Sequence, residues 1–270
     1  MEKIFDYDIH LGVLSISLFV LGIIIFSLAL AALYRFVEKH HHIFEKYHLY
    51  TLILNIFALF FFAKMLEDVV NHDMITQIDV WVNHQMTLWW NPTLNQIMIF
   101  ITNIISPLVL LSMTGILFVY LWYKKQHYRA ILLGFSLASG LASFELVKLI
   151  IKRARPENAL IHVPEYSFPS GHSTMAIIFF SMLIFTLKDR IKNRILKSIF
   201  ITFNIILFLA IAFSRVYLDV HWLSDVLGGL SLGLFWTTFY ILILKMYAAY
   251  YKTGNAKWLE KLSRKKRINN

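Results

Sequence analysis

Residues 128–156 read YRAILLGFSLASGLASFELVKLIIKRARP, and this stretch decides the fold. Its apolar part, residues 130–147, carries one charged side chain, Glu145, and is followed by four basic residues and a proline. About 20 mainly apolar residues are enough for a helix to cross a bilayer. The stretch therefore predicts a membrane-spanning helix over 128–151, which Pro156 prevents from continuing much further.

The composition of the whole chain agrees with this reading. Of the 270 residues, 58% are hydrophobic and only 16% are charged, against roughly a quarter charged in soluble domains. We therefore expect an all-α, polytopic membrane helical bundle of about seven transmembrane helices. Their predicted ranges are 11–34, 49–66, 95–122, 128–151, 172–187, 196–215 and 223–247. Because the chain contains no cysteine, disulfides, thiolate zinc sites and cysteine nucleophiles are excluded.

The basic residues predict the orientation of the chain in the membrane. Most of the 26 lysines and arginines lie in segments 35–48, 123–129, 188–197 and the tail from 245. These segments share one side if seven helices alternate, and the positive-inside rule makes that side cytoplasmic. Segments 67–94, 152–171 and 216–222 then lie outside. Topology thus explains the net charge of +10, and we expect membrane lipids but no nucleic acid as partners.

Three short polar clusters fall at the predicted outer helix ends, although they were not used to draw the topology. They are KLIIKRARP at 148–156, PSGH at 169–172 and SRVYLDVHWLSD at 214–225. Charges at such positions are costly and are usually retained for function. The clusters therefore mark the candidate site.

The first cluster is suited to holding phosphate. Lys148 and Arg155 are seven residues apart and share a face if the helix persists between them. An ammonium and a guanidinium at one helix end form a phosphate clamp, to which the guanidinium adds bidentate geometry. Taken alone, the pair could equally be two cations that snorkel to the interface.

The other two clusters supply histidines. Ser170 is a plausible helix N-cap, Gly171 permits close backbone approach, and His172 would lie beside an anion at the helix start. His221 and Asp225 are four residues apart, so a carboxylate can fix one ring nitrogen and leave the other free to attack. An ordinary capped helix and a helix-end salt bridge are the structural alternatives.

Together the three clusters supply the groups that phosphoryl transfer requires, which no single cluster does. With Arg215 they provide an anion cradle, a nucleophile, an orienting carboxylate and a second proton carrier. Phosphoryl transfer is catalysed by this kind of positioning and charge stabilisation.

The pattern KxxxxxxRP, PSGH and SRxxxxxHxxxD resembles the three-part signature of the type 2 phosphatidic acid phosphatase (PAP2) superfamily, in its bacterial membrane lipid phosphatase branch. The resemblance covers roughly residues 79–230. It implies that His221 is a nucleophile forming a phosphohistidine, that Asp225 orients it and that His172 protonates the leaving group. It also implies phosphate binding by Lys148, Arg155, Arg215, Ser170 and Gly171. Family members need no metal, and we expect no cofactor.

The resemblance predicts three regions in the chain. These are N-terminal transmembrane helices at 1–66, a PAP2-like catalytic membrane domain at 67–250 and a basic cytoplasmic tail at 251–270. Membrane members commonly have six helices, so the helix at 11–34 would be an addition. The oligomeric state is left open.

The expected activity is metal-independent hydrolysis of a lipid phosphate at the periplasmic or extracellular face. By family analogy undecaprenyl diphosphate is favoured, while phosphatidylglycerophosphate and phosphatidic acid remain open. A lipid A phosphatase or phosphotransferase would share the phosphohistidine step. A transporter or an inactive scaffold is the non-enzymatic alternative. A soluble haloperoxidase can carry similar motifs, but the hydrophobicity of the chain excludes it.

Several other charged residues have expected roles. Glu145 lies three residues before Lys148 and is expected to neutralise it. Lys64 is spaced for local ion pairs with Glu67 and Asp68.

Two features have no role assigned by the motifs. Asp219, inside the third cluster, brings a negative charge near the expected phosphate site. His40 to His42 are interpreted as a polar loop rather than a metal site, because consecutive residues on a helix point in different directions.

Overall fold

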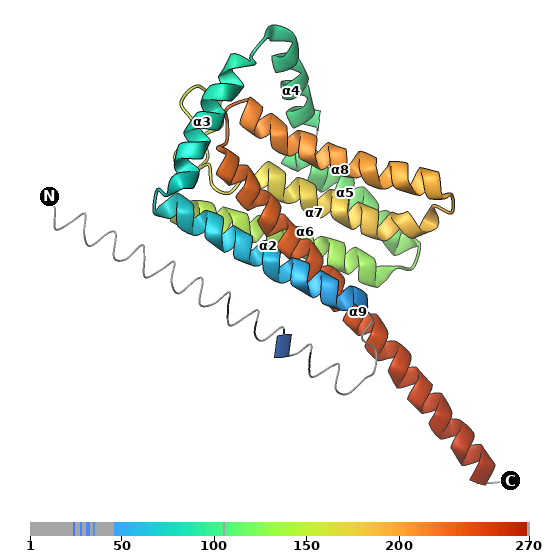
Figure 1. Cartoon of the computed structure of the whole chain (residues 1–270). Coiled ribbons are helices and arrows are strands. Elements are labelled where there is room, and N and C mark those ends of the chain that lie inside the picture. Colours follow the sequence, from blue (N-terminus) through green and yellow to red (C-terminus); the bar gives the residue numbers. More distant parts are fainter. Residues whose placement is uncertain are drawn as a thin grey trace. The chain divides into compact units, whose positions relative to one another are not determined.

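The computed structural model describes residues 46–104 and 106–268, together with positions 24, 28, 31, 32 and 35. The predicted helix at 11–34, apart from four of those positions, and the histidines at 40–42 lie outside the described residues. Within the described ranges every regular element is a helix (Figure 1), which confirms the all-α prediction. The elements are α2 (Lys46–Val70), α3 (Met74–Leu88), α4 (Pro92–Ile104), α5 (Pro107–Tyr123), α6 (His127–Ile151), α7 (Gly171–Leu187), the 3-10 turn η1 (Lys188–Arg190), α8 (Arg194–Tyr217) and α9 (Leu223–Ile268).

Two compact units make up the chain, and the larger one, residues 57–237, contains all three polar clusters. In this unit α7 packs between α6 and α8, and α5 packs against α6 (Figure 1). The other unit comprises residues 1–56 and 238–270. Its described part includes a buried hydrogen bond of 2.9 Å from Asn55 Nδ2 to Thr238 Oγ1.

The described residues form five helices that are long and apolar enough to cross a membrane. These are Leu49–Val70, His127–Ile151, Gly171–Arg190, Arg194–Tyr217 and Leu223–Tyr247. The pair α4 and α5 makes a sixth span if it crosses as one bent unit. The chain is a multi-pass membrane protein, and its described part accounts for five or six of the seven predicted spans.

The prediction of one uninterrupted helix over 95–122 is wrong. The structure has two helices there, α4 and α5, bent by 42° relative to each other. Pro107 occupies the first turn of α5, where its missing N–H is not needed, and the Ser106 side chain caps that helix by accepting from Val109 N at 3.5 Å. A proline and a capping serine in sequence therefore start a new helix.

Segment 67–94, predicted to lie at the outer interface, contains α3. Trp81 and Trp89 are exposed, as an interfacial aromatic belt requires. Trp90 instead donates from Nε1 to the carbonyl of Tyr217 at 2.8 Å. This bond, together with the packing of Met86 on the buried cluster of Tyr217, Leu218 and Val220, fixes α3 against the end of α8.

The start of α7 is pressed closely against α9. A Cβ on Gly229 would lie 2.5 Å from the carbonyl oxygen of Ser170, so only glycine permits this approach. Thr174 Oγ1 donates to the Gly229 carbonyl at 3.1 Å, and Ser170 N donates to the Asp225 carbonyl at 2.9 Å. The PSGH turn and the start of α9 are thereby locked together.

On α2, the predicted local ion pairs are confirmed. Lys64 Nζ lies 3.2 Å from Glu67 Oε2 and 2.8 Å from Asp68 Oδ1.

Candidate active site

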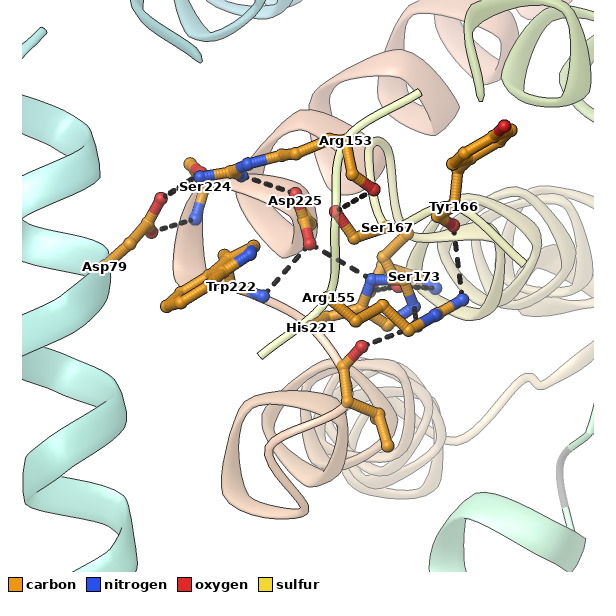
Figure 2. A network of polar contacts seen from close by, with 12 residues as sticks. Asp79, Arg153, Arg155, Tyr166, Ser167, Ser173, His221, Trp222, Ser224 and Asp225 are labelled. Carbon is orange, nitrogen blue, oxygen red and sulfur yellow. Dashed lines mark hydrogen bonds and ion pairs between the residues drawn. The ribbon is translucent and has the colours of Figure 1, made fainter. Parts of the chain in front are cut away.

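The structure brings residues from all three clusters into one polar network (Figure 2). Its labelled residues come from α3, the loop 152–170, the start of α7, the turn that precedes α9 and the first turn of α9. Ser170 of the second cluster joins it through its N–H, which donates to the Asp225 carbonyl at 2.9 Å. The convergence predicted from topology is thus observed.

The first cluster reaches the site in a different way from the one predicted. Helix α6 ends at Ile151, where Lys152 adopts a left-handed conformation with φ of 51°. Lys148 is therefore on the helix and Arg155 is beyond it, so the two do not share a helix face. The reversal of the chain at Lys152, and not helical periodicity, places both residues in the site.

His221 lies between a cation and a carboxylate. Its Nε2 is 3.1 Å from Arg155 Nη1 and its Nδ1 is 3.3 Å from Asp225 Oδ2. Asp225 Oδ2 also accepts from Trp222 N at 3.0 Å. The predicted contact between His221 and Asp225 is confirmed, although His221 sits in the turn just before α9 rather than on it.

The surroundings of His221 favour its neutral form. The imidazole is only 2% exposed. Burial, and then the nearby cations of Arg155, Arg215 and Lys148, hold the pKa of His221 well below its usual range. A neutral imidazole whose Nδ1–H faces a carboxylate presents a lone pair at Nε2. The ring therefore has the protonation state of a nucleophile.

Arg215 is buried at the end of α8. Its Nη1 donates to Thr102 Oγ1 at 2.5 Å, while its Nε has no hydrogen-bond partner. A buried guanidinium with an unused donor is costly and is suited to receive an anion.

The second cluster forms the start of α7, as predicted. Ser170 is the N-cap, and its Oγ accepts from Ser173 N at 3.5 Å and from Ser173 Oγ at 3.0 Å. The close approach that Gly171 permits in this structure is to the Phe144 ring, which a Cβ would meet at 2.9 Å. His172 follows and lies within electrostatic reach of Arg215 and His221.

Lys148 is paired with an acid from the loop 152–170 and not with Glu145. Its Nζ lies 2.6 Å from Glu165 Oε2. This ion pair holds the pKa of Glu165 below its usual value. The prediction that Glu145 neutralises Lys148 is therefore wrong, because the loop after α6 returns Glu165 to the helix end.

Arg155 is likewise engaged by the polypeptide. Its Nε donates to the Glu165 carbonyl at 2.6 Å, its Nη2 to the Tyr166 carbonyl at 3.2 Å and its Nη1 to the Val220 carbonyl at 2.5 Å. The same loop thus covers two of the predicted phosphate ligands, Lys148 and Arg155.

The sequence interpretation missed two charged residues in the network, Arg153 and Asp79. Arg153 Nη1 donates to Asp225 Oδ1 at 2.6 Å and its Nη2 to Asp79 Oδ2 at 2.7 Å (Figure 2). Arg153 lies in the first cluster, in which only Lys148 and Arg155 were predicted to bind phosphate. A lone acid such as Asp79 within an apolar helix is a signal that this residue has a polar partner, although the sequence does not identify that partner as Arg153.

Asp219 is buried in the turn between α8 and α9 with a φ of 58°. Its Oδ1 accepts from Asn83 Nδ2 on α3, whereas its Oδ2 is buried with no partner. Burial raises the pKa of Asp219 to about 6. The carboxylate thus contacts α3, and no contact joins it to the cations of the site among the described residues.

Known proteins are similar to this chain in sequence. Residues 129–248 match the model of the PAP2 superfamily. The chain is 29% identical over 180 residues to phosphatidylglycerophosphatase B of Bacillus subtilis, covering 66% of this chain and 88% of that protein. It is 25% identical over 196 residues to an undecaprenyl-diphosphatase of Sulfolobus acidocaldarius, covering 70% of this chain and 87% of that protein.

A solved structure has the same fold. It is the crystal structure of a transmembrane PAP2 type phosphatidylglycerolphosphate phosphatase from Bacillus subtilis, with a TM-score of 0.64 and 26% identity, covering 69% of this chain and 94% of that one. The family match, the relatives and the common fold agree with the three motifs. Residues 129–248 therefore form a PAP2 superfamily domain.

Proposed function

We propose that this protein is a membrane lipid phosphatase that hydrolyses a phosphate monoester or diphosphate of a lipid through a phosphohistidine on His221. The observation that carries the proposal is the placement of a buried, neutral imidazole between Arg155 and Asp225. The names of both relatives, a phosphatidylglycerophosphatase and an undecaprenyl-diphosphatase, support a lipid phosphate as substrate.

In the first step, Nε2 of His221 attacks phosphorus and the bond from phosphorus to the lipid-side oxygen breaks. His172 donates its proton to that leaving oxygen. Asp225 accepts from Nδ1–H and stabilises the positive charge that develops on the ring. Lys148, Arg155 and Arg215 bind the phosphoryl oxygens and offset their negative charge.

In the second step, His172 removes a proton from water, and the water oxygen attacks phosphorus. The bond from phosphorus to Nε2 breaks, inorganic phosphate leaves and His221 returns to its neutral form. Ser170 and Gly171, at the start of α7, add hydrogen bonds to the phosphoryl group in both steps.

The substrate is expected to be a diphosphate or a monoester whose lipid chain stays in the bilayer. We favour undecaprenyl diphosphate, and phosphatidylglycerophosphate is the second candidate because the Bacillus subtilis relative and the solved structure both carry that name. Phosphatidic acid would need the same chemistry. Transfer of the phosphoryl group to a lipid acceptor instead of water is the alternative outcome of the second step.

The site is proposed to face the periplasm or the extracellular space. The loop 152–170 follows α6, whose other end adjoins the basic segment 123–129, and the positive-inside rule assigns that segment to the cytoplasm. Substrate would then enter from the outer leaflet.

Phosphate release from a panel of purified lipids in detergent tests the proposal. Wild-type protein is expected to release phosphate from at least one lipid monoester or diphosphate, and His221→Ala is expected to be inactive while remaining folded. His162→Ala, which removes an exposed histidine of the outer loop, is the matched control. Substantial turnover by His221→Ala would refute the assignment, and added acceptor lipids would separate hydrolysis from transfer.

A further inference from the structure

Asp79 is a buried acid on α3, outside all three motifs. Its carboxylate is 1% exposed and accepts three hydrogen bonds. Ser224 N donates to Oδ1 at 2.8 Å, Ser224 Oγ donates to Oδ2 at 2.6 Å, and Arg153 Nη2 donates to Oδ2 at 2.7 Å (Figure 2). Asp79 therefore binds a free N–H in the first turn of α9 and one arm of a guanidinium.

Arg153 connects Asp79 to the carboxylate that holds His221. Its Nη1 donates to Asp225 Oδ1 at 2.6 Å and to Ser224 Oγ at 2.7 Å. The guanidinium lies over the Trp222 ring, 5.5 Å from the ring centroid. A planar guanidinium can bind two carboxylates with separate nitrogens, which an ammonium cannot do with the same fixed geometry.

The network fixes the rotamer of Asp225. Because Oδ1 is held by Arg153, Oδ2 is the oxygen that faces His221 Nδ1 and Trp222 N. Its contact with His221, at 3.3 Å, is longer than its contact with Trp222 N, at 3.0 Å. A small rotation of the carboxylate would break it, so the orientation of His221 depends on Arg153.

The charges also require Asp79. Arg153 paired with Asp225 alone would cancel the charge that stabilises a positive His221 ring. The second carboxylate, Asp79, balances Arg153 and leaves a net negative charge beside the imidazole. Buried charges of this kind are stable only when each is paired and hydrogen-bonded, and removing one partner leaves another uncompensated.

We propose that Asp79 and Arg153 are positioning residues that act through Asp225 to hold His221 in line for attack. The inference rests on the proposed phosphatase function. Neither residue contacts the predicted phosphate ligands Lys148 or Arg215 in the described hydrogen bonds and ion pairs. Their loss should therefore slow the chemical step and spare phosphate binding.

The test compares Asp79→Asn with Asp68→Asn, which removes a carboxylate of the α2 ion pair with Lys64. For Asp79→Asn we expect kcat to fall at least tenfold, while KM for the lipid and the calorimetric Kd for inorganic phosphate change less than twofold. Asp68→Asn should keep all three values. A wild-type kcat in Asp79→Asn, or a parallel loss of phosphate binding, would overturn the proposal.

Arg153→Lys and Arg153→Gln provide a second test if Asp79→Asn does not accumulate as folded protein. The lysine variant keeps the charge and should retain more kcat than the glutamine variant, with both below wild type. Equal kcat values for wild type and Arg153→Gln would reject the role. If wild-type protein releases no phosphate from any lipid, the proposed function fails. If wild-type protein is active and the variants match its kcat, only the positioning role fails.

Discussion

Arg155 Nη1 lies 3.1 Å from His221 Nε2, although the two residues are 66 positions apart in the chain. Two groups that can both be cationic are stable at this distance when the imidazole is neutral and its lone pair accepts from the guanidinium. The contact selects the tautomer with the proton on Nδ1, facing Asp225. A phosphoryl group that enters between the two side chains would break this hydrogen bond. Arg155 would then bind a phosphoryl oxygen, and His221 Nε2 would face the phosphorus atom.

The pH dependence of catalysis follows from this contact. His221 must be neutral to attack, and Arg155, Arg215 and Lys148 contribute to its low pKa. Arg155→Gln removes one positive charge, so the pKa of His221 should rise and the acidic limb of the kcat/KM profile should move to higher pH. At the optimum we expect kcat/KM to fall about 100-fold, because one phosphate ligand is lost.

The control for this profile is Arg190→Gln, which removes a cation that stacks on Tyr120, away from the site. Its acidic limb should coincide with that of wild-type protein. An unshifted limb in Arg155→Gln would mean that the group titrating there is not His221.

Glu165 is paired with Lys148, one of the proposed phosphate ligands. Its carboxylate lies 2.6 Å from Lys148 Nζ, so a phosphate that binds this cation would compete with Glu165. Because the Glu165 side chain is 60% exposed, the pair contributes no more than about 1 kcal/mol. Glu165→Gln should therefore bind inorganic phosphate roughly threefold to fivefold more tightly by calorimetry.

Glu157→Gln, which changes an exposed carboxylate of the same loop, controls for the general loss of negative charge. Its phosphate affinity should match that of wild-type protein. Equal phosphate affinities in the two variants, or weaker phosphate binding in Glu165→Gln, would show that Glu165 does not compete with phosphate for Lys148.

The sequence predicted the meeting of the motifs because each lies at a helix end, and alternating spans bring such ends to one face. It did not predict the pair of Lys148 and Glu165. Helical spacing favoured Glu145, but the partner is set by how the loop after Lys152 folds back. Ser106 and Pro107 indicate a helix break before Pro107. The prediction of one helix over 95–122 followed the continuous hydrophobicity of that segment instead.

Asp79 and Arg153 could not be paired from the sequence. They are 74 residues apart, and their contact depends on how α3 docks against the start of α9. That docking rests on tertiary contacts such as the hydrogen bonds from Ser224 N and Oγ to the Asp79 carboxylate. Local periodicity carries no information about such packing.

Asp219 should limit stability at neutral pH. Burial raises its pKa from 3.8 to about 6, so the folded protein binds this proton more tightly than the unfolded chain does. The favourable contribution is present below about pH 4 and is lost as the pH rises to about 6, which costs at most about 3 kcal/mol. Asp219→Asn should raise the Tm in detergent at pH 8 and change it little at pH 4. An equal shift at both pH values would contradict a buried carboxylate as the cause.

The sidedness of the site can be measured cleanly because the chain has no cysteine. Glu157→Cys places a thiol in the loop after α6, and Lys192→Cys places one between α7 and α8. A membrane-impermeant maleimide should label position 157 in intact cells and position 192 only after permeabilisation. Labelling in the reverse order would put the site on the cytoplasmic face.

Trapping of the covalent intermediate tests the central claim most directly. Protein is incubated with a lipid labelled with ³²P in its terminal phosphate and is then quenched in alkali, because phosphohistidine is stable in alkali and labile in acid. The protein is digested, and the labelled peptide is identified. Our account predicts label on the peptide that contains His221 in wild-type protein and none in His221→Ala. Label that persists in His221→Ala would contradict the assignment of His221 as the nucleophile.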